Sequence, residues 1–303
     1  MARLLVVLVL ALVGAPVADA VLAPPTPYPQ TESVLVHYRA HDGVRRSALL
    51  LLPAGYHGQR IPLVISPHGR GIGEEENGLV WGDLPGEGGF AVINPAGEGR
   101  RLHWFSWGAP GEIADLARMP QIARRYGVNV DPRHVYAFGG SMGGQEALLL
   151  LGRHPRLLAG VAAFDPATDM ARRYHDFAAL PHGRELQRLA RAEIGGTPEQ
   201  VPRAYALRSP DHFADAIADS HVPLQLFWST HDRVIRDQMH ETQALAVALR
   251  NDGDRSHVWD FRGDWQHTAE MEPAHSLPRA LARFGLLPWT DVPRGELRPP
   301  GFA

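Results

Sequence analysis

A glycine-rich turn, F-G-G-S-M-G-G, surrounds Ser141. An apolar run at Val135–Phe138 precedes it and a helical pattern follows it through Leu151, which predicts a strand, a tight turn and a helix. Such a turn strains the serine backbone and exposes its hydroxyl, while side chains at Gly139 or Gly143 would clash where strand and helix approach. The positive end of the helix would point at the reacting oxygen. The pattern predicts a serine nucleophile for acyl transfer; a structural glycine-rich turn or a phosphate loop is the alternative.

A serine hydroxyl is a poor nucleophile until a base removes its proton, and that base needs a third group to orient it. After a turn of this kind, the acid and the histidine follow the serine in chain order. Asp232 follows the next expected core strand, Leu224–Trp228, and is the predicted acid. Asp237, about one turn later, is the second choice, and a plain helix N-cap is the alternative role for Asp232.

His267 follows the last expected strand, Val258–Phe261, and is the predicted base. His275 lies beside a helix expected to begin near Ser276 and is interpreted as a surface or cap residue. None of the 16 histidines belongs to an H-E-x-x-H or similar ligand pattern. We therefore expect neither a catalytic metal nor a cofactor.

Acyl transfer also needs N–H donors for the tetrahedral oxyanion. The main-chain N–H of Met142, the residue after the serine, is one predicted donor. The segment P-H-G-R-G (67–71) is predicted to supply the other, with the N–H of Arg70 as first choice and that of Gly71 as the alternative. An ordinary turn is the competing interpretation of this segment.

Two further features flank these residues. Trp104, Phe105 and Trp107 form an aromatic cluster that would line the substrate pocket, although aromatic residues more often belong to a core. Glu74–Glu76 would meet a substrate amine, but a solvated charge run is the favoured interpretation.

The elements that must position these residues alternate between strands and helices. This alternation predicts an α/β fold with a mostly parallel sheet of about eight strands and helices on both faces. Val34–Tyr38 and Ala48–Leu52 are expected to open the sheet as an antiparallel pair. Further strands are expected at Leu63–Ser66, Phe90–Asn94 and Gly160–Phe164, and further helices at Gly111–Tyr126, Thr242–Arg250 and Leu277–Phe284.

The stretch between Phe164 and Val222 is too long for a plain crossover loop. Arg184–Ile194 within it has an amphipathic helical pattern. We expect residues 165–222 to form a cap-like insertion after strand six, over the carboxyl edge of the sheet, where ligands bind in open α/β sheets.

Residues 1–20 have the pattern of a signal peptide. Arg3 supplies a positive charge, Leu4–Val13 is an unbroken apolar run, and A-D-A (18–20) has the small-x-small pattern of a cleavage site. The apolar run is about half as long as a transmembrane helix. We expect a secreted or extracytoplasmic protein without a stable membrane anchor, in which residues 21–303 form a single catalytic domain; a buried N-terminal helix is the alternative.

Composition narrows the possible chemistry. The chain has 303 residues, 45% hydrophobic and 21% charged, which excludes a wholly disordered chain. All 30 basic residues are arginine and there is no cysteine, so lysine amines, thiolates and disulfides are excluded. With a formal charge of -3 and no polybasic run, nucleic acid is not an expected partner. The oligomeric state is left open.

The chain resembles the α/β-hydrolase superfamily, with Ser141, Asp232 and His267 in the order of its triad. Several segments are similar to the catalytic domain of prolyl oligopeptidase-like hydrolases: G-G-T-P-E (195–199), Tyr205, R-S-P (208–210) and residues 223–234. The front half resembles secreted feruloyl esterases and polyhydroxyalkanoate depolymerases: N-P-A-G (94–97), Trp107 and Asp115. These similarities extend over most of residues 60–270.

The resemblance implies a serine hydrolase that works through an acyl-enzyme. We expect carboxylic esters, small or polymeric, as substrates, because the propeller that restricts the related peptidases to short peptides is missing and because amide cleavage must protonate a poor leaving group. A small serine peptidase is the second hypothesis. A catalytically dead secreted binding protein on a hydrolase scaffold is the third, and the ordered set of three triad residues argues against it.

Overall fold

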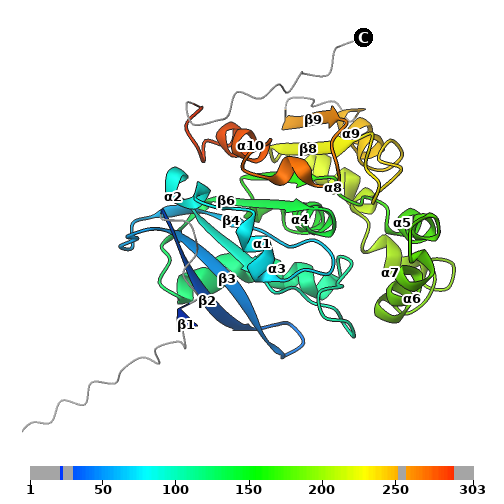
Figure 1. Cartoon of the computed structure of the whole chain (residues 1–303), viewed down its shortest axis with the longest axis horizontal. Coiled ribbons are helices and arrows are strands. Elements are labelled where there is room, and N and C mark those ends of the chain that lie inside the picture. The colour runs from blue at the N-terminus through cyan, green and yellow to red at the C-terminus, as the bar shows by residue number, and fades with distance from the viewer. Residues whose placement is uncertain (1–20, 23–29, 252–256, 290–303) are drawn as a thin grey trace, which may run out of the picture.

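A computed structural model describes residues 21–22, 30–251 and 257–289 (Figure 1). The predicted signal peptide, residues 1–20, lies outside the described residues. In the described part, nine strands form one sheet in the order β1-β2-β3-β5-β4-β6-β7-β8-β9. The strands are β1 (Val21–Leu22), β2 (Thr31–Arg39), β3 (Arg45–Pro53), β4 (Ile61–Ile65), β5 (Ala91–Pro95), β6 (Val130–Gly140), β7 (Gly160–Phe164), β8 (Leu224–Ser229) and β9 (Val258–Gly263).

The sheet is antiparallel at one end and parallel elsewhere. β1 pairs with β2, β2 with β3 and β3 with β5 in antiparallel fashion, and the pairs from β5–β4 to β8–β9 are parallel. Every residue of β5, β7 and β8 is buried, as expected of central strands that are covered on both faces. The α/β prediction and the antiparallel opening pair are confirmed.

Helices cover both faces because alternate strand residues point to opposite sides of the sheet. Leu63 and Ile65 of β4 pack into one layer, and Val64 packs into the other. The first layer holds α3 (Pro110–Arg125), α4 (Met142–Arg153), α8 (Ala214–Asp219) and α9 (Thr242–Asn251). The second holds α1 (Glu74–Leu79), α2 (Leu84–Gly88) and α10 (Leu277–Arg283). Short 3-10 turns occur at Pro155–Leu157, Phe177–Ala179, Pro210–Phe213 and Ala269–Met271.

Strand β6 begins at Val130 rather than at the expected Val135. Ile61 of β4 pairs with Val130 and Leu63 pairs with Val135, so the intervening residues, Pro132 among them, bulge out of the ladder. Because proline has no N–H to donate, the sequence pattern favours a later start. The bulge leaves the carboxyl end of β6, which leads into the Ser141 turn, in regular pairing with β7.

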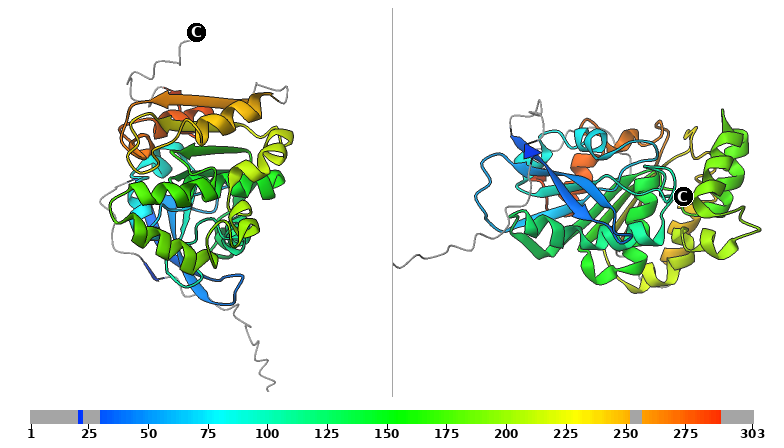
Figure 2. Two further views of the ribbon diagram at one scale, coloured as in Figure 1. Left: turned by 90° about the vertical axis from the view of Figure 1, so that its right-hand side faces the viewer. Right: turned by 90° about the horizontal axis from the view of Figure 1, so that it is seen from below.

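Three helices of the long insertion form a cap: α5 (Met170–Asp176), α6 (Gly183–Ile194) and α7 (Pro202–Ala206). They project beyond the carboxyl ends of the parallel strands (Figures 1 and 2). Their apolar side chains pack with Trp107, from the loop before α3, into a small separate core. The rest of the insertion, α8, packs against α4 and α9 in the first layer. Among the described residues, every helix is too short or too polar to span a lipid bilayer.

Candidate active site

Ser141 occupies the strained turn that the sequence predicts. It stands between the end of β6 and the start of α4, with φ 58° and ψ -123°, in a region that L-residues rarely adopt. A Cβ at Gly139 would lie 2.3 Å from the carbonyl carbon of Gly143, and one at Gly143 would lie 2.1 Å from the carbonyl oxygen of Pro67. Both glycines are therefore required for the close approach of strand, helix and the neighbouring loop.

The structure brings His267 and Asp232 together. Nδ1 of His267 lies 2.7 Å from Oδ2 of Asp232, whose side chain is fully buried. The other carboxylate oxygen accepts the main-chain N–H groups of Val234 at 2.7 Å and Ile235 at 2.9 Å. Burial acts to raise the pKa of Asp232, but the hydrogen bond and charge of His267 and the two N–H groups outweigh it, so the pKa lies below its ordinary value.

Ser141 and His267 line one cavity of about 310 Å³, which we call the Ser141 cavity. Nε2 of His267 is buried and has no hydrogen-bond partner among the described residues. The ring nitrogen that does not contact Asp232 is therefore free to bond with a group that enters this cavity.

The second-choice residues lie elsewhere. Asp237 forms an ion pair with Arg172 at 3.1 Å and contacts Nδ1 of His240 at 2.7 Å. His275 is exposed, and Glu270 and Glu272 are its nearest charged partners. Neither residue lines the Ser141 cavity, so the geometry favours Asp232 and His267.

The segment 67–71 runs over the serine. A Cβ at Gly69 would lie 4.0 Å from Cβ of Ser141. The N–H of Gly71 donates to the carbonyl oxygen of Trp104 at 3.3 Å, whereas the N–H of Arg70 donates to no acceptor in the described part of the chain. Of the two alternatives for the second oxyanion donor, the hydrogen bonding favours Arg70.

The predicted aromatic and acidic residues lie at different places in the structure. Trp107 lines a small cavity beside Ser141 and also belongs to the cap core. Trp104 packs against His103 and beside Gly73, and it does not line the Ser141 cavity. Glu74–Glu76 form the first turn of α1, where acidic groups favour the helix N-terminus, and Glu76 accepts the N–H of Gly73.

Asp165 is a residue of this site that the sequence prediction missed. It follows the last residue of β7, is fully buried, and accepts three N–H groups: Ser229 N at 3.0 Å, Trp265 Nε1 at 3.1 Å and Thr268 N at 2.8 Å. Two of these donors flank His267 in the chain. Its position at the carboxyl end of a central strand is the signal that could have identified it.

Two groups of side chains among the described residues have ligand atoms close enough for a metal ion. The first group is Asp165, Asp232 and His267. The atoms of these side chains that could bind a metal already take part in the hydrogen bonds described above. In the second, Nδ1 of His41 lies 3.0 Å from Asp115 and 3.1 Å from Glu98. This second group lies apart from the Ser141 cavity.

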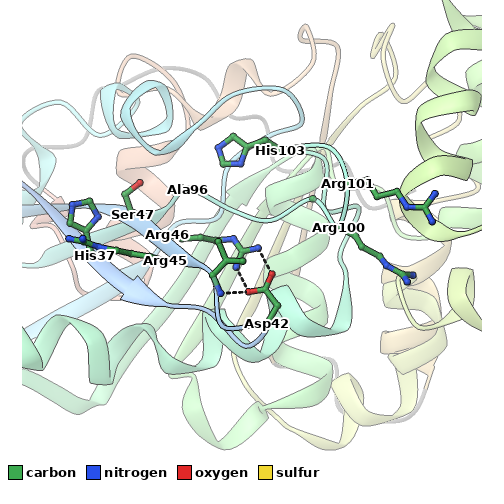
Figure 3. Close-up of a pocket in the computed structure, with 11 residues that line it drawn as sticks. His37, Asp42, Arg45, Arg46, Ser47, Ala96, Arg100, Arg101 and His103 are labelled. Carbon is green, nitrogen blue, oxygen red and sulfur yellow. Dashed lines mark hydrogen bonds and ion pairs between the residues drawn. The ribbon is translucent and has the colours of Figure 1, made fainter.

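A larger cavity of about 610 Å³ lies near that second group. Arg46 and Asp42 form a bidentate pair on its wall, with N···O distances of 2.8 and 2.9 Å (Figure 3). It shares no lining residue with the Ser141 cavity in the described part of the chain. Its size alone therefore does not make it the reaction site.

The sheet topology and the strained serine turn are those of the α/β-hydrolase fold. The model of the prolyl oligopeptidase family matches residues 90–281, which is more than half of the chain. The protein belongs to the prolyl oligopeptidase family, and the family prediction made from sequence is confirmed. A search of curated proteins finds no match.

Solved structures with the same fold include peptidases and esterases. An acylaminoacyl peptidase from Pyrococcus horikoshii is 15% identical with a TM-score of 0.64, over 84% of this chain and 41% of that one. A Mycobacterium tuberculosis puromycin-hydrolyzing peptidase is 20% identical with a TM-score of 0.63, over 86% and 39%. An acetyl xylan esterase from Paenibacillus sp. R4 is 17% identical with a TM-score of 0.62, over 88% and 87%. The chain thus spans about two fifths of the length of these two peptidases and most of the esterase.

Proposed function

We propose that the protein is a secreted hydrolase of carboxylic esters that uses Ser141, His267 and Asp232 as a catalytic triad. Nε2 of His267 takes the proton of the Ser141 hydroxyl while its oxygen attacks the ester carbonyl carbon. The N–H groups of Met142 and Arg70 bind the oxyanion. The C–O bond to the alcohol then breaks, the alcohol leaves with the proton from His267, and water hydrolyses the acyl-enzyme by the same steps.

One observation carries this proposal. His267 has one ring nitrogen bonded to a buried, ionised carboxylate, and the other has no partner among the described residues; His267 lines the same cavity as the strained Ser141. A nucleophile, a base and an orienting acid at one cavity are what acyl transfer requires.

Ester cleavage is preferred over peptide cleavage because amide cleavage must also protonate a poor leaving group. An acetyl xylan esterase is among the solved structures with this fold. A small serine peptidase is the second candidate, supported by the family to which the chain belongs. Secretion is proposed from the signal-peptide pattern of residues 1–20.

The first test is hydrolysis of 4-nitrophenyl butyrate and 4-nitrophenyl palmitate by residues 21–303 and by Ser141→Ala. We expect butyrate turnover in the parent protein, weaker turnover of palmitate, and neither in the variant. Xaa-Pro anilides measured beside these esters distinguish the peptidase from the esterase. If the parent protein hydrolyses none of these compounds and is not labelled by a fluorophosphonate, the proposed function is wrong.

Secretion has a separate test. The full chain expressed in a bacterium is expected to yield a mature product that begins near Val21 and is recovered outside the cytoplasmic membrane. N-terminal sequencing of that product measures the cleavage site, and a full-length product retained in the cytoplasm would contradict secretion.

A further inference from the structure

A second cavity, of about 20 Å³, adjoins Ser141 on the side of the cap. Two arginines line it, Arg70 from the segment over the serine and Arg173 from α5, together with Trp107 and Phe177. We call it the arginine cavity. It has Ser141 and Arg70 in common with the Ser141 cavity, so a molecule bound at the serine reaches both spaces.

Arg173 is a buried charge without a bound counter-charge. The residue is 5% exposed, and its Nη1 atom is buried without a hydrogen-bond partner in the described part of the chain. Its guanidinium carbon lies 4.6 Å from the ring centre of Phe177, which fixes the side chain but gives Nη1 no acceptor among the described residues. Burying such a group without a partner is costly, unless a ligand completes the site.

Arg70 is the second arginine at this cavity that lies over aromatic rings. Its guanidinium carbon lies 5.8 Å from the ring centre of Trp107 and 5.9 Å from that of Phe177. It forms no side-chain hydrogen bond or ion pair with another described residue. Two guanidinium groups thus lie over Phe177 beside the serine, and neither forms an ion pair within the described part of the chain.

Three carboxyl groups, those of Glu241, Asp176 and Asp232, attract Arg173, but none of them forms an ion pair with it among the described residues. One of the Glu241 oxygens accepts the N–H of Thr168 at 2.7 Å instead. Burial raises the pKa of Glu241 to about 8, so this carboxyl is largely protonated at pH 7. Burial, with a smaller contribution from the positive charge of Arg70, lowers the pKa of Arg173 to about 10, so Arg173 is still charged at pH 7.

We propose that the arginine cavity binds a carboxylate carried by the ester substrate, so that the enzyme acts on esters of dicarboxylic or hydroxycarboxylic acids. This inference rests on the proposed function. A planar carboxylate matches the fork of guanidinium donors. The cavity is small, about 20 Å³, and a carboxylate is less bulky than a phosphate ester, the other anion that guanidinium groups commonly bind.

Paired esters test the preference and show which side of the ester carries the charge. The acyl pair is the 4-nitrophenyl monoester of adipic acid and its methyl ester; the alcohol pair is 4-acetoxybenzoate and methyl 4-acetoxybenzoate. In at least one pair, kcat/KM of the parent protein should be higher for the charged member. Arg173→Gln should lower that value by about 10- to 100-fold and change the neutral member by less than about twofold. Arg173→Lys, which keeps the charge, should recover part of the loss.

Arg153→Gln is the matched control. Arg153 also lies over a ring, that of Phe213 at 4.7 Å, but it donates to the carbonyl oxygen of Leu207 at 2.8 Å and lines neither cavity. Its loss should leave the charged-to-neutral ratio unchanged. An equal loss on both members of each pair in Arg173→Gln would overturn the proposal, because it would indicate a structural role or a role at the oxyanion. Absence of any preference in both pairs would overturn it too.

A binding measurement keeps the inference separate from the proposed reaction. Adipate should bind to Ser141→Ala in isothermal titration calorimetry, and the additional change Arg173→Gln should abolish this binding. Adipate binding without ester turnover would support the arginine cavity while contradicting the proposed function. Turnover of the neutral esters without adipate binding and without a charge preference would support the proposed function and contradict the arginine cavity.

Discussion

At the scale of single residues, two buried carboxylates beside the histidine segment are held in different states. Asp232 contacts His267, and its pKa lies below the ordinary value although burial acts to raise it. Burial raises the pKa of Asp165 to about 7, although the charge of His267 and three N–H donors act against this. Asp232 therefore stays ionised at neutral pH, whereas Asp165 titrates there.

Asp232→Asn should leave the fold intact and lower kcat for 4-nitrophenyl butyrate by about 10³- to 10⁴-fold, since the amide favours the wrong tautomer of His267. KM should change little. The same substitution at Asp237, which pairs with Arg172 instead, is the control and should keep kcat within about twofold. Equal losses in the two variants would contradict the assignment of the acid.

Asp165→Asn replaces an oxygen that accepts N–H groups with an amide donor. We expect the free energy of unfolding, measured with urea, to fall by about 1–3 kcal/mol because buried donors lose their acceptor. Turnover should fall as well, since Trp265 and Thr268 hold the segment that carries His267. Asp169→Asn is the control: Asp169 also accepts two main-chain N–H groups, but at a helix N-cap, where asparagine serves equally well.

At the scale of elements, β6, α4 and the loop 67–71 pack so closely at Ser141 that an added side chain would clash. The first turn of α4 touches the carbonyl groups of Pro67 and His68 through Gly143. The loop that carries Arg70 is therefore positioned by the start of the helix that follows the serine. Substitutions in that turn should disturb Ser141 and the loop 67–71, which carries the proposed oxyanion donor Arg70, together.

Gly143→Ala tests this coupling. The added methyl would lie 2.1 Å from a backbone oxygen, so the loop must shift. We expect a loss of about 1–3 kcal/mol in stability and at least about 10²-fold in kcat/KM. Gly127→Ala separates the steric effect from backbone strain, since Gly127 has φ +87° but open space around it. That variant should lose about 1 kcal/mol and keep its activity.

The elements with the strongest sequence patterns were the most predictable. β7 was predicted with its observed bounds because a short apolar run between glycine and polar residues defines a strand that is buried on both sides. α1 and α2 were missed because E-E-E-N-G-L and L-P-G-E-G lack a helical apolar pattern. Packing of Trp81 and Leu84 against the sheet stabilises this region instead.

Residues whose role depends on contacts between distant parts of the chain were harder to predict from the sequence. Ser141, Asp232 and His267 each follow a strand, so their order along the chain was enough to bring them together. No sequence pattern predicted a role for Arg173. Its guanidinium group lies over Phe177, which packs against Trp107 from a distant part of the chain, and no local pattern indicates that contact.

At the scale of the whole molecule, buried carboxyl groups link stability to pH. Burial raises the pKa of Glu146 on α4 to about 8, and burial does the same for Glu241. An unfolded glutamate releases its proton near pH 4.3, so between about pH 4.3 and 8 the folded chain holds protons that the unfolded chain has lost. The unfolding free energy should therefore fall as pH rises across this window, by up to about 1.4 kcal/mol per pH unit for each group.

Glu146→Gln should remove one of these contributions. Urea denaturation between pH 5 and 8 is expected to show a shallower decline for the variant than for the parent protein. Glu75→Gln, at an exposed position, is the matched control and should leave the decline unchanged. A variant with the parent slope would contradict the idea that Glu146 is protonated in the folded state.

The cap leaves the sheet after β7 and returns at β8, and these two strands are direct neighbours. Its helices bring their own core, with Trp107 as the contribution from outside the insertion. Sequence change, exchange or lengthening among the cap helices, residues 170–206, would therefore leave the pairing of these strands intact, whereas Asp165 at the start of the insertion is needed to hold the His267 segment. The segment that lines the cavity beside Ser141 can therefore change while the strands that lead to Ser141, Asp232 and His267 keep their positions.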